Sequence, residues 1–305
     1  PASPNAAAIE AEVKKHIESD DLSALKTYVL SSITARSFGD LSAFLKAVVS
    51  CASTDKAKAG AIEILTFVND RRYDSGAKKL SCVLDMVRNA LTDIFMAFPK
   101  LSDTKNSRYS YIDWDSRDTL RAPEGSEQVL VINARAFEPE GPNCDSRLMN
   151  KAFNLGWKHY ICFGYKGQRF TGCGFGPKTT DVTIHVYDSS GDYLASGIDG
   201  LEIQVHGNAQ DQLGQIMKSG KLVIHGDVGQ TFMYGAKGGE VYIMGNAAGR
   251  PLINATGKPR VVINGTCLDY LAESFMAGDP LNGGGFVILN GMAFDEKGKL
   301  KPQET

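Results

Sequence analysis

The sequence predicts a multi-domain α+β protein that ends in a right-handed parallel β-helix, a solenoid of short parallel strands. Three observations predict this class: helical periodicity over the first third of the chain, a strand–helix–strand pattern after it, and a phrase that then recurs about every 19 residues. A period near 20 residues is typical of solenoids, in which each unit buries its apolar face only by stacking on the next. The expected parts are a helical domain (1–98), a linker (99–127), an α/β connector (128–179), the β-helix (180–292) and a polar tail (293–305).

The helical domain is predicted from apolar residues that recur at spacings of three and four. Five such runs begin at Ile9, Leu22, Leu41, Ile62 and Leu80. This spacing places the apolar side chains on one face of each helix, so we expect five amphipathic helices packed as a bundle.

Two similar segments of this bundle follow an aspartate. Asp21 and Asp40 each precede a helical run, and aspartate is a preferred residue at a helix N-cap, so we expect both to be N-caps. No catalytic pattern occurs in this domain. Two roles remain open for it: a docking module for a partner, or a cap that covers the solenoid.

The connector resembles a βαβ unit, with strand-like runs at 128–132 and 159–163 around a helical run at 146–155. It leads into Gly172-Cys173-Gly174-Phe175-Gly176, a literal G-x-G-x-G. A dinucleotide site requires such glycines between a strand and a helix, but Pro177 and a β-like run follow here. We therefore expect the glycines to permit a tight entry into the first coil.

Each repeat of the β-helix begins with a short strand of alternating character. The expected strands are 183–188, 201–205, 221–224, 240–243, 260–263 and 286–289, about six turns in all. Alternate side chains of a strand point to opposite faces, which gives two apolar columns pointing into the solenoid. One outward column alternates in charge, which supports this register because opposite charges become neighbours. Its members are Glu202, Lys221, Glu240 and Arg260.

A glycine follows each of the last five strands. These predicted turn glycines are Gly207, Gly226, Gly245, Gly265 and Gly291. The first four are 19, 19 and 20 residues apart, and each precedes an Asn, Asp or Thr. Such residues close turns and tolerate a left-handed backbone, so we expect a structural role for both positions.

A second outward column becomes apolar along the solenoid. It begins with Gln204 and continues with Val223, Tyr242, Val262 and Ile288. An apolar stripe on the outside of a solenoid is usually covered, so we expect these four apolar residues to face a partner.

Three side chains are candidates for chemistry. Cys173 is a possible nucleophile, but no histidine or acid is tied to it by sequence. His206 and His225 occupy equivalent places in adjacent turns, so their rings should lie about 5 Å apart. The next residues of this column, Met244 and Asn264, are poor zinc ligands, and His185 is placed one position out of step. We expect no metal site.

Composition narrows the class of protein further. The net charge of −2 gives no electrostatic reason to expect nucleic acid as a partner. No run of 18 apolar residues and no secretory signal is found, so membrane insertion is not expected. Six scattered cysteines without a C-x-x-C indicate neither a disulfide framework nor an iron–sulfur site, and they predict a cytoplasmic protein.

Residues 226–243 resemble a turn of the glycine-rich β-helix that closes the large (alpha) subunit of glutamate synthase, the GXGXG domain. One of the subunits of formylmethanofuran dehydrogenase is built on a similar coil. The resemblance covers roughly 125–292 and implies a structural domain without catalytic residues. The amidotransferase cysteine, the flavin barrel and the iron–sulfur cysteines of glutamate synthase have no counterpart in this sequence, which resembles a detached GXGXG subunit.

The resemblance implies a non-catalytic structural or assembly subunit of a multisubunit glutamate-synthase-like oxidoreductase complex. This chain would bind no cofactor, and its partners would be redox subunits that carry flavin and iron–sulfur clusters; several copies of the chain could occur in one complex. Two alternatives remain. One is a subunit of a formylmethanofuran-dehydrogenase-type complex with molybdenum or tungsten, and the other is an independent enzyme that uses Cys173 or the His206/His225 column.

Overall fold

The computed structural model describes residues 3–103, 106–294 and 299–302, and the chain divides into two compact units. One unit is helical and consists mainly of residues up to Phe98. The other contains the solenoid and consists mainly of residues 99–293. In the described residues, no helix is both long enough and apolar enough to cross a membrane.

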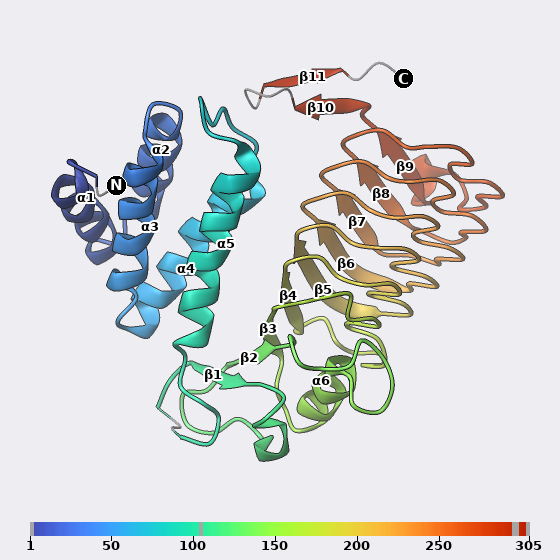
Figure 1. Cartoon of the computed structure of the whole chain (residues 1–305). Helices are drawn as coiled ribbons and strands as arrows, with labels where there is room; N and C mark the ends of the chain where they lie inside the picture. Colours follow the sequence, from blue (N-terminus) through green and yellow to red (C-terminus); the bar gives the residue numbers. More distant parts are fainter. Residues whose placement is uncertain (1–2, 104–105, 295–298, 303–305) are drawn as a thin grey trace. The chain divides into compact units, whose positions relative to one another are not determined.

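The helical unit contains the five helices that the periodicity predicts (Figure 1). They are α1 (Ala6–Glu18), α2 (Leu22–Ile33), α3 (Phe38–Cys51), α4 (Asp55–Asp70) and α5 (Leu80–Met96). Their apolar faces form one core in which Val13, Leu25, Val48, Leu65 and Val83 are fully buried. The bundle is thus stabilised by the residues whose spacing indicated it.

One of the two expected N-caps has a different position in the structure. Asp21 caps α2 and accepts a 3.0 Å hydrogen bond from the backbone N–H of Ala24. Asp40, however, lies inside α3, and the N-cap is Ser37. The two side chains form a capping box, in which Asp40 N–H donates to Ser37 Oγ and Ser37 N–H donates to Asp40 Oδ2, both at 3.1 Å. The prediction for Asp40 was wrong because aspartate serves equally well in the third position of a capping box.

The solenoid unit is built on one parallel sheet whose strands follow each other in chain order (Figure 1). The strands are β1 (Tyr109–Ile112), β2 (Val129–Asn133), β3 (His159–Phe163), β4 (Thr183–Tyr187), β5 (Asp199–His206), β6 (Ser219–Ile224), β7 (Glu240–Ile243), β8 (Arg260–Ile263) and β9 (Phe286–Leu289). The six strands expected from the repeat correspond to β4–β9. The fold class predicted from the sequence is confirmed.

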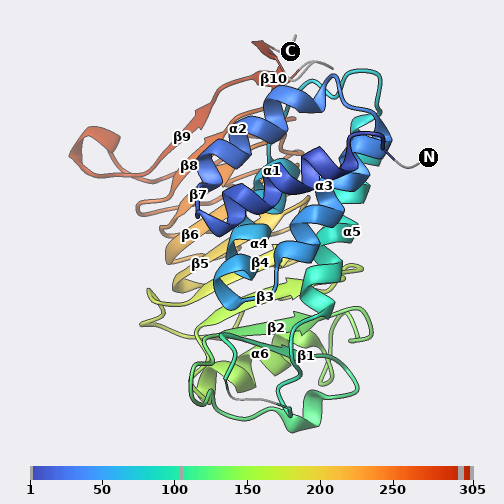
Figure 2. The same cartoon turned by 90° about the vertical axis from the view of Figure 1, so that its left-hand side faces the viewer.

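The sheet begins earlier than the repeat indicated. Strand β1 lies within the range expected to be a linker, and β2 and β3 of the connector continue the same sheet. All four residues of β1 are buried, including its two tyrosines and a serine, and this composition hid the strand among polar neighbours. Helix α6 (Asp145–Asn154) packs beside β1–β3, as Figures 1 and 2 both show.

The register agrees with the expected columns. Ile203 pairs with Leu222, which pairs with Val241, and this inward column is fully buried as far as Val261. In the charged outward column, Lys221 Nζ lies 3.6 Å from Glu202 Oε1, and Arg260 Nη1 lies 3.5 Å from Glu240 Oε1. Both pairs are partly exposed, so each stabilises the fold by only a few tenths of a kcal/mol.

Three short elements complete the described structure. Two are 3₁₀ turns, η1 (Arg117–Thr119) and η2 (Pro280–Asn282). The third is a two-stranded sheet of β10 (Met292–Phe294) and β11 (Leu300–Pro302), in the range expected to be a polar tail. Residues 295–298 and 303–305 of that range lie outside the described part.

Candidate functional site

A ladder of side chains links the turns of successive coils. Asn208 Oδ1 accepts the backbone N–H of Asp227 at 2.9 Å, Asp227 Oδ1 accepts that of Asn246 at 2.7 Å, and Asn246 Oδ1 accepts that of Thr266 at 2.9 Å. None of these four residues has a left-handed backbone. Asn208, Asp227 and Asn246 therefore occupy the turns for their hydrogen bonds to the next coil, and not for a left-handed backbone.

The turn glycines are required by close approach between coils. A Cβ atom on Gly226 would lie 2.1 Å from Asn208 Oδ1, and one on Gly245 would lie 2.2 Å from Asp227 Oδ1. Gly291 differs, because its φ is +62° and nothing lies within 4 Å of the position of a Cβ atom. The ladder and three of these glycines, Gly226, Gly245 and Gly265, thus form one structural device, since the ladder side chains fill the space that each glycine leaves, whereas Gly207 lies against the backbone carbonyl of Asp188.

A second periodic feature explains the literal G-x-G-x-G. Gly172, Gly174 and Gly176 have φ values of +78°, +82° and +76°, so alternate residues of this segment are left-handed. Later coils repeat this alternation, mostly without glycine. The left-handed residues there are Tyr193, Ala195 and Gly197; Gln212, Gly214 and Ile216; Thr231, Met233 and Gly235; Arg250, Leu252 and Asn254; and Tyr270, Ala272 and Ser274.

The alternation directs successive backbone N–H groups to opposite neighbours. Gln212 and Ile216 donate to carbonyls of the following coil at 2.8 Å, whereas Gly214 donates to the preceding coil at 2.8 Å. The G-x-G-x-G segment is therefore the first coil of this pattern. It stands between β3 and β4 and has no helix behind it to bind a pyrophosphate, so the expected entry role agrees with its geometry.

Cys173 lies in this segment, half-buried. Its thiol donates a hydrogen bond to the backbone carbonyl of Tyr193, 3.2 Å from Sγ, and burial raises the pKa of the thiol to about 12. A nucleophilic cysteine needs a lowered pKa, so this environment keeps the thiol protonated and unreactive. All six cysteines of the chain are free.

The histidine column extends further than the sequence indicated. The ring centroids of His206 and His225 lie 5.1 Å apart, close to the expected separation, and one ring nitrogen of each lies within 4.8 Å of the other. His185 joins them: its ring stacks on His206 at 5.3 Å, and its Nδ1 lies 3.0 Å from His206 Nε2. His185 pairs in register with Gln204, and Tyr187 pairs with His206, so the offset is two positions and not one.

The rings of this column are nearly parallel to one another. The planes of His185 and His206 are tilted by 7°, and those of His206 and His225 by 16°. The contact between His185 and His206 nitrogens is a hydrogen bond that occupies one donor and one acceptor. The column is thus a stacked and hydrogen-bonded ladder on the outward side of the sheet.

The second outward column has the predicted register, with Val223 beside Tyr242 and Val262 beside Ile288. The side chains of Tyr242 and Ile288 are 37% and 46% exposed, whereas Val223 and Val262 are half-buried. That this column faces a partner stays a prediction.

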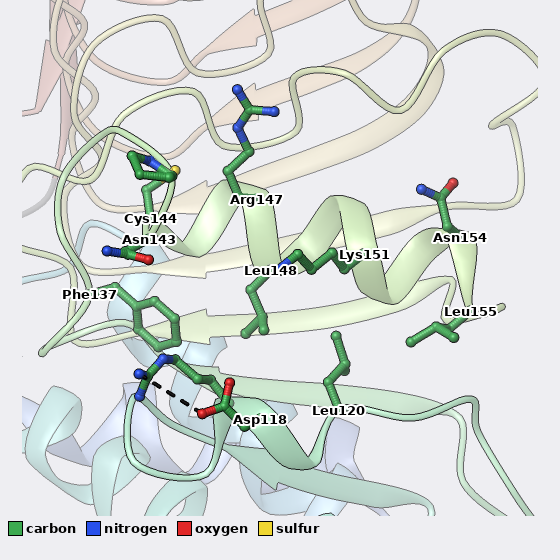
Figure 3. A pocket seen from close by; sticks show the side chains of 12 residues that line it. Asp118, Leu120, Phe137, Asn143, Cys144, Arg147, Leu148, Lys151, Asn154 and Leu155 are labelled. Carbon is green, nitrogen blue, oxygen red and sulfur yellow. Dashed lines mark ion pairs between the residues drawn. The ribbon is translucent and has the colours of Figure 1, made fainter.

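A concave site of the solenoid unit lies beside α6, and we refer to it as the α6 hollow (Figure 3). Its volume is about 600 Å³, in the range of small-molecule pockets. Three separate segments of the chain line it. The lining residues are Arg117, Asp118, Leu120, Phe137, Pro142, Asn143, Cys144, Arg147, Leu148, Lys151, Asn154 and Leu155.

The α6 hollow has an apolar floor and a charged rim. Leu148 projects from α6 toward Leu120 on the opposite wall, and Phe137 closes the end near Asn143 (Figure 3). Phe137 and Leu148 are buried, whereas Leu155 at the other end is 41% exposed. The rim carries three cations and a single carboxylate, which belongs to Asp118.

Behind this hollow, the first helical residue of α6 has an unusual environment. Asp145 is completely buried, and burial raises its pKa to about 6, although the hydroxyl of Tyr165 donates to Oδ2 at 2.8 Å and opposes the rise. Oδ1 has no hydrogen-bond partner among the described atoms. The same Tyr165 hydroxyl lies 3.0 Å from Thr171 Oγ1, which ties α6 to the G-x-G-x-G segment.

Sequence reasoning did not find the α6 hollow. Its residues belong to η1 and the residue after it, to the loop before α6, and to α6 and the residue after it, and no sequence motif links these segments. The sequence pattern that could have indicated the hollow is the amphipathic character of α6. Arg147 and Lys151 are four residues apart on this helix, and Leu148 lies on its buried side.

A protein-family model matches part of this chain. Residues 164–295 match the family model described as the GXGXG motif, from the segment before Gly172 to the residues after Gly291. No curated protein and no solved structure matches the chain.

Proposed function

Because residues 164–295 form a GXGXG-motif domain, we propose that this chain is a non-catalytic assembly subunit of a multisubunit, glutamate-synthase-like oxidoreductase complex. In this proposal the solenoid is a rigid surface on which redox subunits dock. Those subunits supply the flavin and iron–sulfur chemistry, and this chain binds none of these groups.

One observation carries the proposal: large apolar side chains lie exposed on the last two coils. Leu268 is 65% exposed, Met276 69% and Leu281 93%. Tyr270, Ile288 and Leu289 of the same coils are also exposed. Apolar side chains gathered on one part of a surface commonly mark a site of protein–protein contact, because covering them removes apolar area from water.

The end of the sheet supports docking at the same place. Strand β9 is the outermost described strand of the nine-stranded sheet, so its far edge has no further strand of that sheet beside it. Leu289 continues an inward column that is fully buried in β5–β8, yet it is 41% exposed. A partner that stacks on this end would continue both the sheet and its core.

The test is purification of the protein from its native cells at low salt, followed by mass spectrometry of what accompanies it. A complex that contains flavin and iron–sulfur subunits is the expected result. The alternative, a formylmethanofuran-dehydrogenase-type complex, predicts molybdenum or tungsten in place of flavin. A colourless single chain at every salt concentration would reject assembly with redox subunits.

Variants then test the docking surface. Leu281→Lys, on the last coil, should release the partners. Met96→Lys is a matched control, because Met96 is 52% exposed but belongs to the helical unit. Equal release by both variants would show that the end of the solenoid is not the docking site.

A further inference from the structure

We propose that the α6 hollow binds a small organic anion: a compact apolar body that carries one carboxylate or phosphate group. This inference is independent of the proposed assembly role, because it concerns a different surface of the solenoid unit and a different class of ligand.

The floor of the hollow accounts for the apolar body. Phe137, Leu120 and Leu148 come from three segments and face a common space of about 600 Å³. Phe137 also packs edge-on against Trp114, with ring centroids 5.4 Å apart, so the floor is held in place from behind. A pocket of this size with an apolar lining and few polar groups is typical of sites for small molecules.

The rim accounts for the negative charge. Arg147 and Lys151 stand four residues apart on α6, and neither side chain makes a hydrogen bond or ion pair within the described part of the chain. Two like charges at this spacing destabilise a helix slightly. An anion bound between the rim cations would relieve this repulsion.

The single carboxylate of the rim, that of Asp118, does not cancel the positive charge of the three rim cations. Arg117 Nη2 lies 4.0 Å from Asp118 Oδ2, so the single carboxylate already has a cationic neighbour, and its side chain is 88% exposed. The hollow therefore carries two more cations than carboxylates, counting Arg117, Arg147 and Lys151 against Asp118. Cys144, the N-cap of α6, also lines the hollow and makes no side-chain capping bond.

The structure contains its own reporter for such binding. The guanidinium of Arg117 lies over the ring of Trp114, 3.8 Å from the centroid. A ligand that contacts Arg117 or Phe137 should change the fluorescence of Trp114. The other tryptophan, Trp157, is buried, and its Nε1 donates to the carbonyl of Arg121 at 2.7 Å, so its signal should stay constant.

The experiment is a titration of the full chain with each of four probes, and binding is measured by calorimetry and by tryptophan fluorescence. Phenyl phosphate and phenylacetate carry both parts of the expected ligand and separate phosphate from carboxylate preference. Phenol lacks the anion, and inorganic phosphate lacks the apolar body. We expect one of the first two to bind at least roughly tenfold more tightly than either fragment, because charge-assisted contacts and apolar burial then act together.

Variants locate the site. Arg147→Glu combined with Lys151→Glu should weaken the tighter probe by roughly tenfold or more, and Lys151→Gln should weaken it less. Lys218→Glu is the matched control, an exposed lysine of the same unit outside the hollow. Circular dichroism shows whether each variant folds. If the double variant does not fold, the affinity of Lys151→Gln tests whether the probe binds in the hollow.

Two results would overturn the proposal. One is that phenyl phosphate and phenylacetate both bind no better than phenol at millimolar concentrations. The other is that Lys151→Gln and Lys218→Glu change the affinity of the tighter probe equally.

Discussion

Asp227 Oδ1 accepts a 2.7 Å hydrogen bond from the backbone N–H of Asn246, one coil further along the solenoid. Its own backbone N–H donates to Asn208 Oδ1 of the coil before it, at 2.9 Å. Asp227 thus joins three coils. An acceptor side chain recurs at this place in the repeat for that reason, and its space comes from the ladder glycine of the following coil, which is Gly245 for Asp227.

The ladder predicts different effects for two substitutions of Asp227. Asp227→Ala removes the acceptor for Asn246 and should lower the free energy of unfolding by about 1 kcal/mol, the usual net contribution of one hydrogen bond. Asp227→Asn keeps an acceptor oxygen and should change it by less than about 0.5 kcal/mol. Chemical denaturation measures both. Equal losses would mean that the negative charge matters rather than the hydrogen bond.

Substitution by alanine should lower stability by different amounts at a glycine that permits close approach between coils and at one that only has a left-handed backbone. Gly226→Ala brings a Cβ atom to 2.1 Å from Asn208 Oδ1 and 2.7 Å from a backbone oxygen, so the coils must separate and stability should fall by about 3 kcal/mol or more. Gly197→Ala meets only Ile216, at 3.9 Å, and its cost comes only from a left-handed φ of +70°, about 1 kcal/mol. Thermal unfolding of the two variants compares them directly. A larger loss for Gly197→Ala would contradict this explanation of the ladder glycines.

The raised pKa of Asp145 predicts that the free energy of unfolding falls as the pH rises. Burial raises the pKa of this carboxyl from 3.8 to about 6 in the folded protein. The folded state therefore holds the proton more tightly, and this favourable contribution, complete below pH 3.8, is lost as the pH rises through about 6. Between about pH 5 and 7.5 the loss should be about 1–2 kcal/mol.

Asp145→Asn removes the titrating group, so its unfolding free energy should exceed that of the unchanged protein by an amount that grows over the same pH range. Asp85→Asn, on the exposed surface of α5, is the control and should show no such growth. Parallel pH profiles for the unchanged protein and Asp145→Asn would refute the assignment.

Several features of the solenoid were readable from the sequence because they repeat. The spacing of 19 or 20 residues determined the register of β4–β8, and the charges of Glu202 and Lys221 checked it. The left-handed alternation was not readable, because residues such as Thr231 and Met233, which do not favour a left-handed backbone, adopt it in most of the coils. Backbone hydrogen bonds between coils override the local preference of these residues.

The α6 hollow was unreadable for a different reason. Asp118, Phe137 and Lys151 lie in different segments, and they meet because β1 and β2 pair in parallel, so that the segment after β1 and the connection from β2 to β3, which contains α6, start at the same edge of the sheet. Strand β1 was itself missed, so this meeting of loops could not be foreseen. The buried state of Asp145 was hidden too, since an aspartate at the start of a helix is usually exposed.

The apolar outward column predicts a variant that folds but does not assemble. Tyr242 is 37% exposed and points away from the solenoid core, so Tyr242→Glu should leave the coil intact while placing a charge where a partner would exclude water. Val262→Glu, one coil further, should act in the same way. Circular dichroism should be unchanged, and gel filtration of the native complex should show loss of the partner that covers the column.

Tyr234 provides a matched control within the same domain. It is also 37% exposed, but it lies in the left-handed segment between β6 and β7 and not on the outward face of the sheet. Tyr234→Glu should therefore leave the complex intact if the column of Tyr242 and Val262 is the covered surface. Assembly that survives both column variants would reject the column as a docking surface, because a buried glutamate without a partner costs several kcal/mol.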